Sequence, residues 1–296
     1  MSIVSFREML ADARRNRYAV PMFDLSNTTM IRAAAESAEE LGSPVIFAAI
    51  WPDLDGSLLG YWANAARYAA TQVKVPVALH LDHATTIEQC RKCADAGFQS
   101  VMIDASAEPF EKNVAVTAAV AGEMHRRGLD VEAELGHVAV GVVGSGAESE
   151  TGAAGDHTPV FTDPASVVEF TGRTGVDALA VSIGTAHGVY ESAPNLDIAR
   201  LAEIDKVSPV PLVLHGGSGT PEDQLRAAIA NGIAKINIYS ELTAAWNREM
   251  FEFLRNRREM TCWFSVSCRR PEEAMREAMR AKMRLFGSAG RALALF

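Results

Sequence analysis

Three histidines in this chain each close an apolar run that is predicted to be a buried strand. They are His83, His187 and His215, and the last two are each followed by glycine. Imidazole nitrogens bind divalent zinc, and three such ligands leave a coordination position for a substrate. Because the chain holds only seven histidines, their concentration at strand ends favours a shared metal site over the alternative of three unrelated loop histidines.

Acidic side chains occur at the same kind of position. Asp82 directly precedes His83, so it is a candidate general acid or base for a substrate held on the metal, and a purely structural role is the alternative. Glu134 is a candidate fourth metal ligand, or else a carboxylate paired with a neighbouring cation. Asp104, together with Ser106, is a candidate site for a second cation or for substrate hydroxyls, or else a solvated loop acid.

A glycine-rich turn follows the third of these histidines. Gly216, Gly217 and Ser218 lie just before Pro221, which is predicted to open a helix. Exposed backbone N–H groups at the start of a helix bind phosphate well. In barrel enzymes phosphate often binds at the loops after the seventh and eighth strands, where this turn and residues 237–240 are expected. The turn is therefore a candidate phosphate site.

The elements that must position these residues alternate along the chain. The hydrophobic pattern predicts strands at residues 18–23, 44–49, 75–81, 99–103, 130–135, 177–183, 211–215 and 234–238. It predicts helices at residues 27–41, 57–72, 86–96, 109–127, 164–174, 196–206, 221–231 and 241–256, with a long loop at 136–161.

Eight strand–helix units favour an α/β fold, a single (β/α)8 TIM barrel with an additional C-terminal helix at about residues 271–284. A doubly wound open sheet is the alternative. No linker or composition break divides the chain, so residues 1–296 are expected to form one domain. The candidate site residues all fall at the C-terminal ends of strands, where one barrel mouth brings them together.

The composition excludes some classes of partner. A net charge of −9 argues against nucleic acid or an anionic membrane surface as the main partner. Residues 1–10 carry charges and no long apolar run, so they do not predict a signal peptide. No segment approaches the roughly 20 apolar residues of a membrane span. The expected location is cytoplasmic.

The cysteines and one late segment leave alternatives open. Cys90 and Cys93 form a C-x-x-C motif, which indicates either zinc or redox chemistry or, more simply, two small residues on one helix face. With Cys262 and Cys268 they fit a reducing compartment. The apolar segment 261–268 is expected to be an oligomer contact or a helix.

With these residues assembled, the chain resembles the class II, zinc-dependent ketose-bisphosphate aldolases, which include fructose- and tagatose-bisphosphate aldolases. The resemblance extends over nearly the whole chain, from Tyr18 to Gly290. Its most specific segments are residues 79–83, 132–136, 184–188, 214–219 and 235–238.

The resemblance implies a lyase of carbohydrate metabolism, such as glycolysis, that releases dihydroxyacetone phosphate and an aldehyde through a zinc-stabilised enediolate. Zn²⁺, or another divalent metal, would be held by His83, His187 and His215, with Glu134 nearby. Asp82 would move a proton to or from the hydroxyl on the carbon being cleaved. The family is usually a homodimer or homotetramer.

The resemblance also implies where the sugar phosphate binds. A monovalent cation, Na⁺ or K⁺, often binds near the phosphate in this family. Asn237 would contact the triose, and the phosphate would meet Gly188, Gly216, Ser218 and Ser240.

The chain departs from the family pattern at the substrate end. Asp24 stands where members usually have asparagine, Ile50 stands near a usual serine or threonine, and Tyr239-Ser240 replaces a usual serine or aspartate followed by threonine. If Asp24 lies in the pocket, its carboxylate would repel a second anionic group. We therefore expect an aldehyde partner that is polar and uncharged rather than glyceraldehyde 3-phosphate.

The loop that usually carries a proton-shuttling glutamate departs as well. The family position falls near Val142, so Glu148 or Glu150 is predicted to serve instead, as a catalytic acid on a closing loop. Two alternatives remain: another metal-dependent sugar-phosphate lyase or isomerase on the same barrel, and a non-catalytic sugar-phosphate-binding protein.

Overall fold

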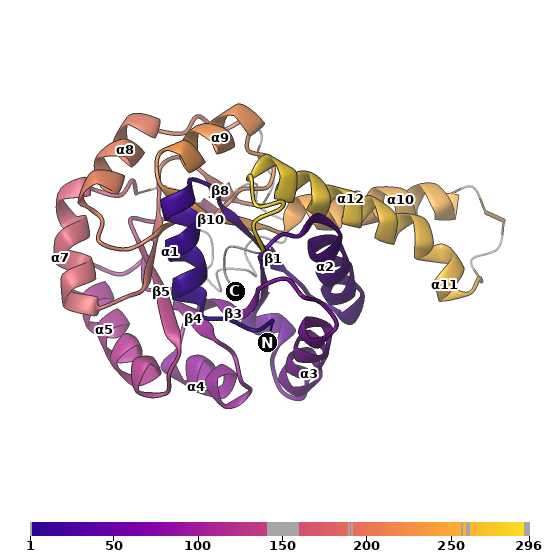
Figure 1. Ribbon diagram of the computed structural model, residues 1–296, viewed down its shortest axis with the longest axis horizontal. Helices are drawn as coiled ribbons and strands as arrows, with labels where there is room; N and C mark the ends of the chain where they lie inside the picture. The colour runs from indigo at the N-terminus through magenta and orange to yellow at the C-terminus, as the bar shows by residue number, and fades with distance from the viewer. Residues whose placement is uncertain are drawn as a thin grey trace.

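The structure is a computed structural model that describes residues 2–140, 160–188, 190, 192–255, 257–258 and 261–292. Within that part of the chain, eight parallel strands close into a barrel in the order β1-β10-β9-β7-β5-β4-β3-β2 (Figure 1). Their bounds are β1 Val20–Asp24, β2 Val45–Ile50, β3 Val77–Ala84, β4 Ser100–Ile103, β5 Asp130–Leu135, β7 Ala178–Val181, β9 Leu212–Leu214 and β10 Ile233–Ile238. The predicted (β/α)8 barrel is confirmed.

Helices cover the outside of the barrel, as expected for βα units. Those that follow the strands are α2 Thr28–Leu41, α3 Leu58–Thr71, α4 Ile87–Asp95, α5 Phe110–Arg126, α7 Pro164–Thr174, α8 Ile198–Val207, α9 Glu222–Ala230 and α10 Ser240–Arg255. A short 3₁₀ turn, η1 Trp51–Asp53, follows β2. Strand and helix ends differ from the predicted ones by a few residues.

Two short strands at the barrel mouth were not predicted. β6 Ala139–Val140 and β8 Ala186–His187 pair in parallel as a separate small sheet. Each lies in a loop that follows a barrel strand, and two residues are too short a run to carry a hydrophobic period. Their pairing fixes the backbone at His187, one of the three candidate metal ligands.

A helix at the start of the chain was also missed. α1, Phe6–Asn16, begins at Ser5, whose hydroxyl accepts a hydrogen bond from the Glu8 amide. Figure 1 shows α1 lying across the centre of the barrel. Its apolar face shares one buried cluster with small barrel-interior residues, which leave room for it: Phe6, Met9, Leu10 and Ala13 with Ala48, Ala78, Ala178, Ala180 and Ala234.

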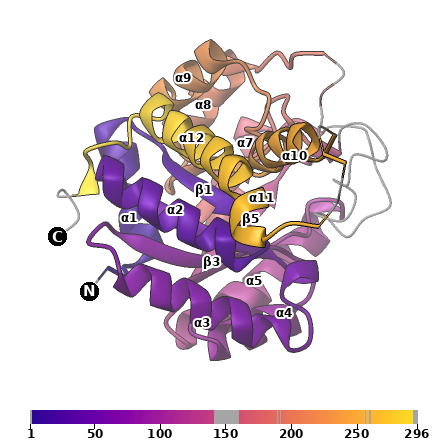
Figure 2. The same ribbon diagram turned by 90° about the vertical axis from the view of Figure 1, so that its right-hand side faces the viewer.

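The C-terminal helices extend from the barrel as an arm (Figure 1). α12, Arg269–Leu285, confirms the predicted additional helix and packs on α2 and α10, as Figure 2 shows. The apolar segment before it holds the short helix α11, Phe264–Ser267. Phe251, Trp263 and Phe264 on this arm are exposed in the single chain. Within the described residues, no helix has the length and apolarity to cross a bilayer.

Candidate active site

The three histidines predicted from the sequence meet at the barrel mouth. One nitrogen from each of His83, His187 and His215 lies within 4.8 Å of the others, and all three side chains are buried. They come from three separate segments, the end of β3, the short strand β8 and the residue after β9. The structure therefore brings together three imidazoles that are spread over more than a hundred residues of the sequence.

A backbone irregularity at the end of β3 places both Asp82 and His83 in the mouth. Consecutive residues of a regular strand point to opposite faces. Here the register with β4 shifts between Leu81 and Ala84, and His83 has a φ of 46°, in the left-handed region that residues other than glycine rarely adopt. The expectation that His83 lies just past the strand was thus wrong, because β3 continues to Ala84 through this bulge.

Carboxylates behind the histidines fix which nitrogen faces the centre. His83 Nδ1 is 2.9 Å from Asp104 Oδ2, and His215 Nε2 is 3.0 Å from Glu132 Oε1. These contacts leave His83 Nε2, His215 Nδ1 and both ring nitrogens of His187 buried without hydrogen-bond partners. Such buried polar atoms are costly unless something binds them. Carboxylate-oriented imidazoles are the usual arrangement around a protein-bound zinc ion, so the donor set fits a divalent metal.

Glu134 completes this donor set. Its Oε2 is 3.6 Å from His215 Nδ1 and has no hydrogen-bond partner, whereas Oε1 accepts a hydrogen bond from the Val138 amide at 2.8 Å. Burial and the nearby carboxylate of Asp104 raise the pKa of Glu134 to about 8. A cation placed between Glu134 and the histidines would favour the ionised form of this carboxyl group.

Asp104 occupies a different position from the direct metal or second-cation site expected of it. Its Oδ2 contacts His83 Nδ1, and its Oδ1 accepts a hydrogen bond from the Ser106 amide at 2.9 Å. The Ser106 hydroxyl in turn lies 2.9 Å from His137 Nδ1. Both oxygens of Asp104 are thus engaged behind His83. The sequence places Asp104 at a strand end, but it does not show whether the carboxylate faces the metal site or contacts the far side of His83.

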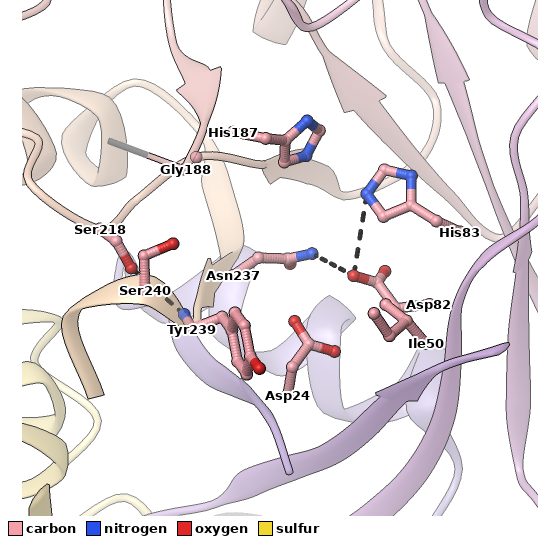
Figure 3. A pocket seen from close by; sticks show the side chains of 11 residues that line it. Asp24, Ile50, Asp82, His83, His187, Gly188, Ser218, Asn237, Tyr239 and Ser240 are labelled. Carbon is pink, nitrogen blue, oxygen red and sulfur yellow. Dashed lines mark hydrogen bonds and ion pairs between the residues drawn. The ribbon is translucent and has the colours of Figure 1, made fainter. Parts of the chain in front are cut away.

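Asp82 lies beside the histidine group and is buried. Its Oδ2 accepts a hydrogen bond from Asn237 Nδ2 at 3.0 Å and is 3.8 Å from His83 Nε2 (Figure 3). Its Oδ1 is 3.7 Å from His80 Nε2. Burial raises the pKa of Asp82, but the charge of His83 and the contact with His80 lower it more, so the net shift is well below the usual value. These contacts favour the charged form of the Asp82 carboxylate and hold it beside the histidines.

A fully buried ion pair lies beneath this site. Lys235 Nζ donates to both oxygens of Glu132, at 2.9 and 2.8 Å, and neither side chain is exposed. Burial raises the pKa of Glu132, but Lys235 and the hydrogen bond from His215 lower it more, to about 2. The chain of contacts from Lys235 through Glu132 to His215 fixes the imidazole. Neither Lys235 nor Glu132 is among the site residues predicted from the sequence.

A pocket opens above these residues and holds most of the predicted substrate residues. It has a volume of about 350 Å³, and Figure 3 shows side chains that line it. Besides Asp82, His83 and His187, it brings together residues from five segments around the mouth: Asp24, Ile50, Gly188, Gly216, Ser218, Asn237, Tyr239 and Ser240. Asp24 lies at the end of β1, so its carboxylate does face the pocket, as the substrate prediction requires.

Gly217 does not line this pocket, contrary to the expectation of a phosphate contact. Its amide donates to the Asn237 carbonyl at 3.2 Å, and an added Cβ would come within 2.5 Å of Ile236 Cγ2. The residue is glycine because β10 passes close to it. Its neighbour Ser218 instead faces the mouth, where its hydroxyl accepts hydrogen bonds from the amides of Tyr239 and Glu241.

The expected loop acids, Glu148 and Glu150, lie outside the described residues.

The two cysteines of the C-x-x-C motif, Cys90 and Cys93, are buried in α4, and burial raises the pKa of Cys90 to about 12. In the part of the chain that the structure describes, neither group of side chains able to hold a metal includes a cysteine. The second such group is His80, Asp82 and Glu132, which belongs to the network under the site.

Comparison with known proteins agrees with this site. The chain is 38% identical to the fructose-bisphosphate aldolase of Geobacillus stearothermophilus, over 99% of each protein. It is 39% identical to the 6-phospho-5-dehydro-2-deoxy-D-gluconate aldolase of Bacillus subtilis, over 99% of this chain and 98% of that protein. The crystal structure of the YdjI aldolase from Escherichia coli K12 superimposes with a TM-score of 0.84 at 33% identity, covering 98% of this chain and 99% of that one.

Residues 4–291 also match the family described as fructose-bisphosphate aldolase class-II. The aldol reaction expected from the sequence is thereby confirmed, and the alternatives of another lyase, an isomerase or a non-catalytic binding protein are not favoured. The chain belongs to the class II fructose-bisphosphate aldolase family, whose reaction is the metal-dependent aldol cleavage of a ketose phosphate.

Proposed function

We propose that the barrel mouth cleaves a ketose phosphate to dihydroxyacetone phosphate and an aldehyde, with a divalent ion, zinc, held by His83, His187 and His215. Glu134 is the proposed fourth and displaceable ligand. The observation that carries this proposal is the group of buried imidazole nitrogens that face one another without hydrogen-bond partners. A bound zinc ion would act as a Lewis acid toward the substrate carbonyl.

The proposed general base is Asp82, and Asp104 is proposed to orient a ligand. In cleavage, the Asp82 carboxylate removes the proton from the hydroxyl on the carbon being cleaved, and in condensation it returns that proton. Its lowered pKa and the hydrogen bond from Asn237 support this role, because they keep it ionised and aimed into the pocket. Asp104, which contacts His83 Nδ1, is proposed to hold that ring in place rather than to bind the metal.

The phosphate is proposed to bind on the opposite side of the pocket. Gly188, Gly216 and Ser218 face it there, and Ser240 is the first residue of α10, a helix of 16 residues. The positive end of that helix favours an anion. A monovalent cation, Na⁺ or K⁺, bound beside the phosphate is part of the same proposal.

The aldehyde half is proposed to carry no second anionic group. Asp24 lines the pocket from the β1 side and is only 8% exposed. No lysine or arginine is among the described residues that line this pocket. A terminal phosphate near Asp24 would therefore meet a carboxylate, and the described lining residues offer it no cationic side chain.

Glu148 or Glu150 is proposed to move the proton of the triose. Glu148→Gln or Glu150→Gln is expected to slow the exchange of the dihydroxyacetone phosphate C3 proton with D₂O by about 100-fold, the usual range for loss of a general acid or base. Proton NMR measures the exchange, and zinc content should not change. Wild-type exchange in both variants and in the double variant would eliminate these two acids.

The assembly and the location of the protein are also proposed. The exposed apolar side chains of the arm, Phe251, Trp263 and Phe264, support assembly as a homodimer or homotetramer. The four free cysteines support a cytoplasmic location. The substrate is a small sugar phosphate.

A coupled assay for dihydroxyacetone phosphate tests the function. Zinc-loaded protein is offered fructose 1,6-bisphosphate, tagatose 1,6-bisphosphate and the corresponding 1-phosphates. We expect release from the 1-phosphates with at least a tenfold higher kcat/KM than from the bisphosphates. Equal turnover of both classes would refute the uncharged aldehyde, and no release from any ketose phosphate would refute the aldolase.

A further inference from the structure

A second cavity adjoins the active-site pocket at Tyr239. It has a volume of about 560 Å³ and lies between the start of α2, α10 and α12. Tyr239 lines both spaces, and its hydroxyl is 3.2 Å from the Ser26 hydroxyl, on the side of the second cavity. We call this space the Tyr239 cavity; it is lined by Ser26, Asn27, Met30, Tyr239, Thr243, Trp246, Asn247 and Met275.

The lining of the Tyr239 cavity is polar but uncharged. Hydroxyl and amide groups come from Ser26, Asn27, Thr243 and Asn247, and Trp246 supplies an aromatic surface. Alternating hydroxyl groups and C–H faces of a polyol match this combination, because hydroxyls pair with neutral donors and acceptors while C–H groups pack on an indole. The described lining has no lysine or arginine to neutralise a phosphate or carboxylate.

The N-terminus of α2 at this cavity is already capped. Asn27 Oδ1 accepts hydrogen bonds from the amides of Thr29 and Met30, at 3.0 and 3.1 Å. These are the first-turn donors of α2 that an anion would otherwise use. The described lining of the cavity thus offers a phosphate no cationic side chain, and the first-turn amides of α2 that Asn27 caps are already engaged.

We propose that the Tyr239 cavity receives the far end of the aldehyde half of the substrate, and that this end is an uncharged polyhydroxylated chain. The inference rests on the proposed function and makes it more specific. The substrate is then a ketose 1-phosphate whose aldehyde product extends past Asp24 and Tyr239. Ser26, Thr243 and Asn247 would bind its distal hydroxyls.

Condensation of dihydroxyacetone phosphate with aldehydes of different length and charge tests the inference. The probes are glycolaldehyde, D-erythrose, L-threose and glyceraldehyde 3-phosphate, each with zinc-loaded protein. We expect at least one tetrose to have a tenfold higher kcat/KM than glycolaldehyde, and a higher one than glyceraldehyde 3-phosphate. A preference for glycolaldehyde or for glyceraldehyde 3-phosphate would overturn the inference.

Variants of α10 locate the effect. Thr243→Leu fills the cavity and should lower the tetrose-to-glycolaldehyde ratio of kcat/KM about tenfold, mainly through KM. Ala244→Leu adds a side chain at the next position, which is exposed, and should leave that ratio unchanged. Asn247→Leu, at an exposed lining residue, repeats the test where folding is not at risk.

The outcomes separate this inference from the function on which it rests. A tetrose preference that survives both Thr243→Leu and Asn247→Leu would show that the cavity does not hold the chain. Condensation without any length preference would overturn the inference and leave the aldolase intact. If no aldehyde condenses at all, the proposed function itself fails, and the inference fails with it.

Discussion

Asp82→Asn is expected to lower kcat by about 10²–10⁴-fold while zinc remains bound, because the variant keeps the shape of the side chain and loses its ability to take a proton. The carboxylate lies 3.8 Å from His83 Nε2 and accepts from Asn237, so it is held beside the proposed metal site and faces the pocket. The coupled assay for dihydroxyacetone phosphate measures kcat, and metal analysis measures zinc.

Asp95→Asn is the matched control for this variant. Asp95 is the last residue of α4, is exposed, and pairs with Arg127 on the surface at 2.8 Å. Its loss should change kcat by less than twofold. If Asp82→Asn keeps kcat within threefold of the wild type at full zinc occupancy, Asp82 is not the general base. If zinc is lost, its role is structural.

Lys235→Met is expected to lower the free energy of unfolding by about 3–5 kcal/mol, the usual result of removing one partner of a buried ion pair. The Glu132 carboxylate would be left fully buried beside His215 without its cation. Urea unfolding followed by circular dichroism measures the change. The double variant Lys235→Met/Glu132→Gln should recover part of the loss, because it removes the unpaired charge.

The pH dependence gives this prediction a second readout. In the wild type, the folded-state pKa of Glu132 is about 2, below its ordinary value of 4.5. The lowered pKa stabilises the fold above about pH 4.5, and this contribution is lost as the pH falls toward 2. In Lys235→Met, burial without the cation should raise that pKa, so this stabilisation disappears. A loss below 1 kcal/mol at pH 7 would mean that the pair contributes little.

The barrel was predictable because each strand is a short apolar run followed by a helical pattern. α1 was not predicted, although Phe6, Met9 and Leu10 have helical spacing. The sequence also gave no sign that small barrel residues such as Ala78 and Ala178 make space for it. That fit depends on side chains that meet only in the closed barrel.

The sequence predicted which residues belong to the candidate site better than it predicted how their side chains are arranged. Strand ends meet at one rim, so the histidines, Asp82 and Glu134 could be grouped from sequence. The bulge at His83 could not be predicted from the sequence, because a register shift is set by the neighbouring strand. The contacts of Asp104 and Gly217 could not be predicted either, since they depend on which neighbouring atoms lie nearest in the folded chain.

Zinc titration of metal-free protein tests the central claim most directly, that His83, His187 and His215 hold the catalytic metal. The protein is stripped with chelator, and the release of dihydroxyacetone phosphate is measured as zinc is added back. We predict no activity without metal, a linear return up to one equivalent per chain, and no return in His215→Ala at the same zinc level. Full activity in the metal-free protein, or a normal titration of His215→Ala, would contradict the claim.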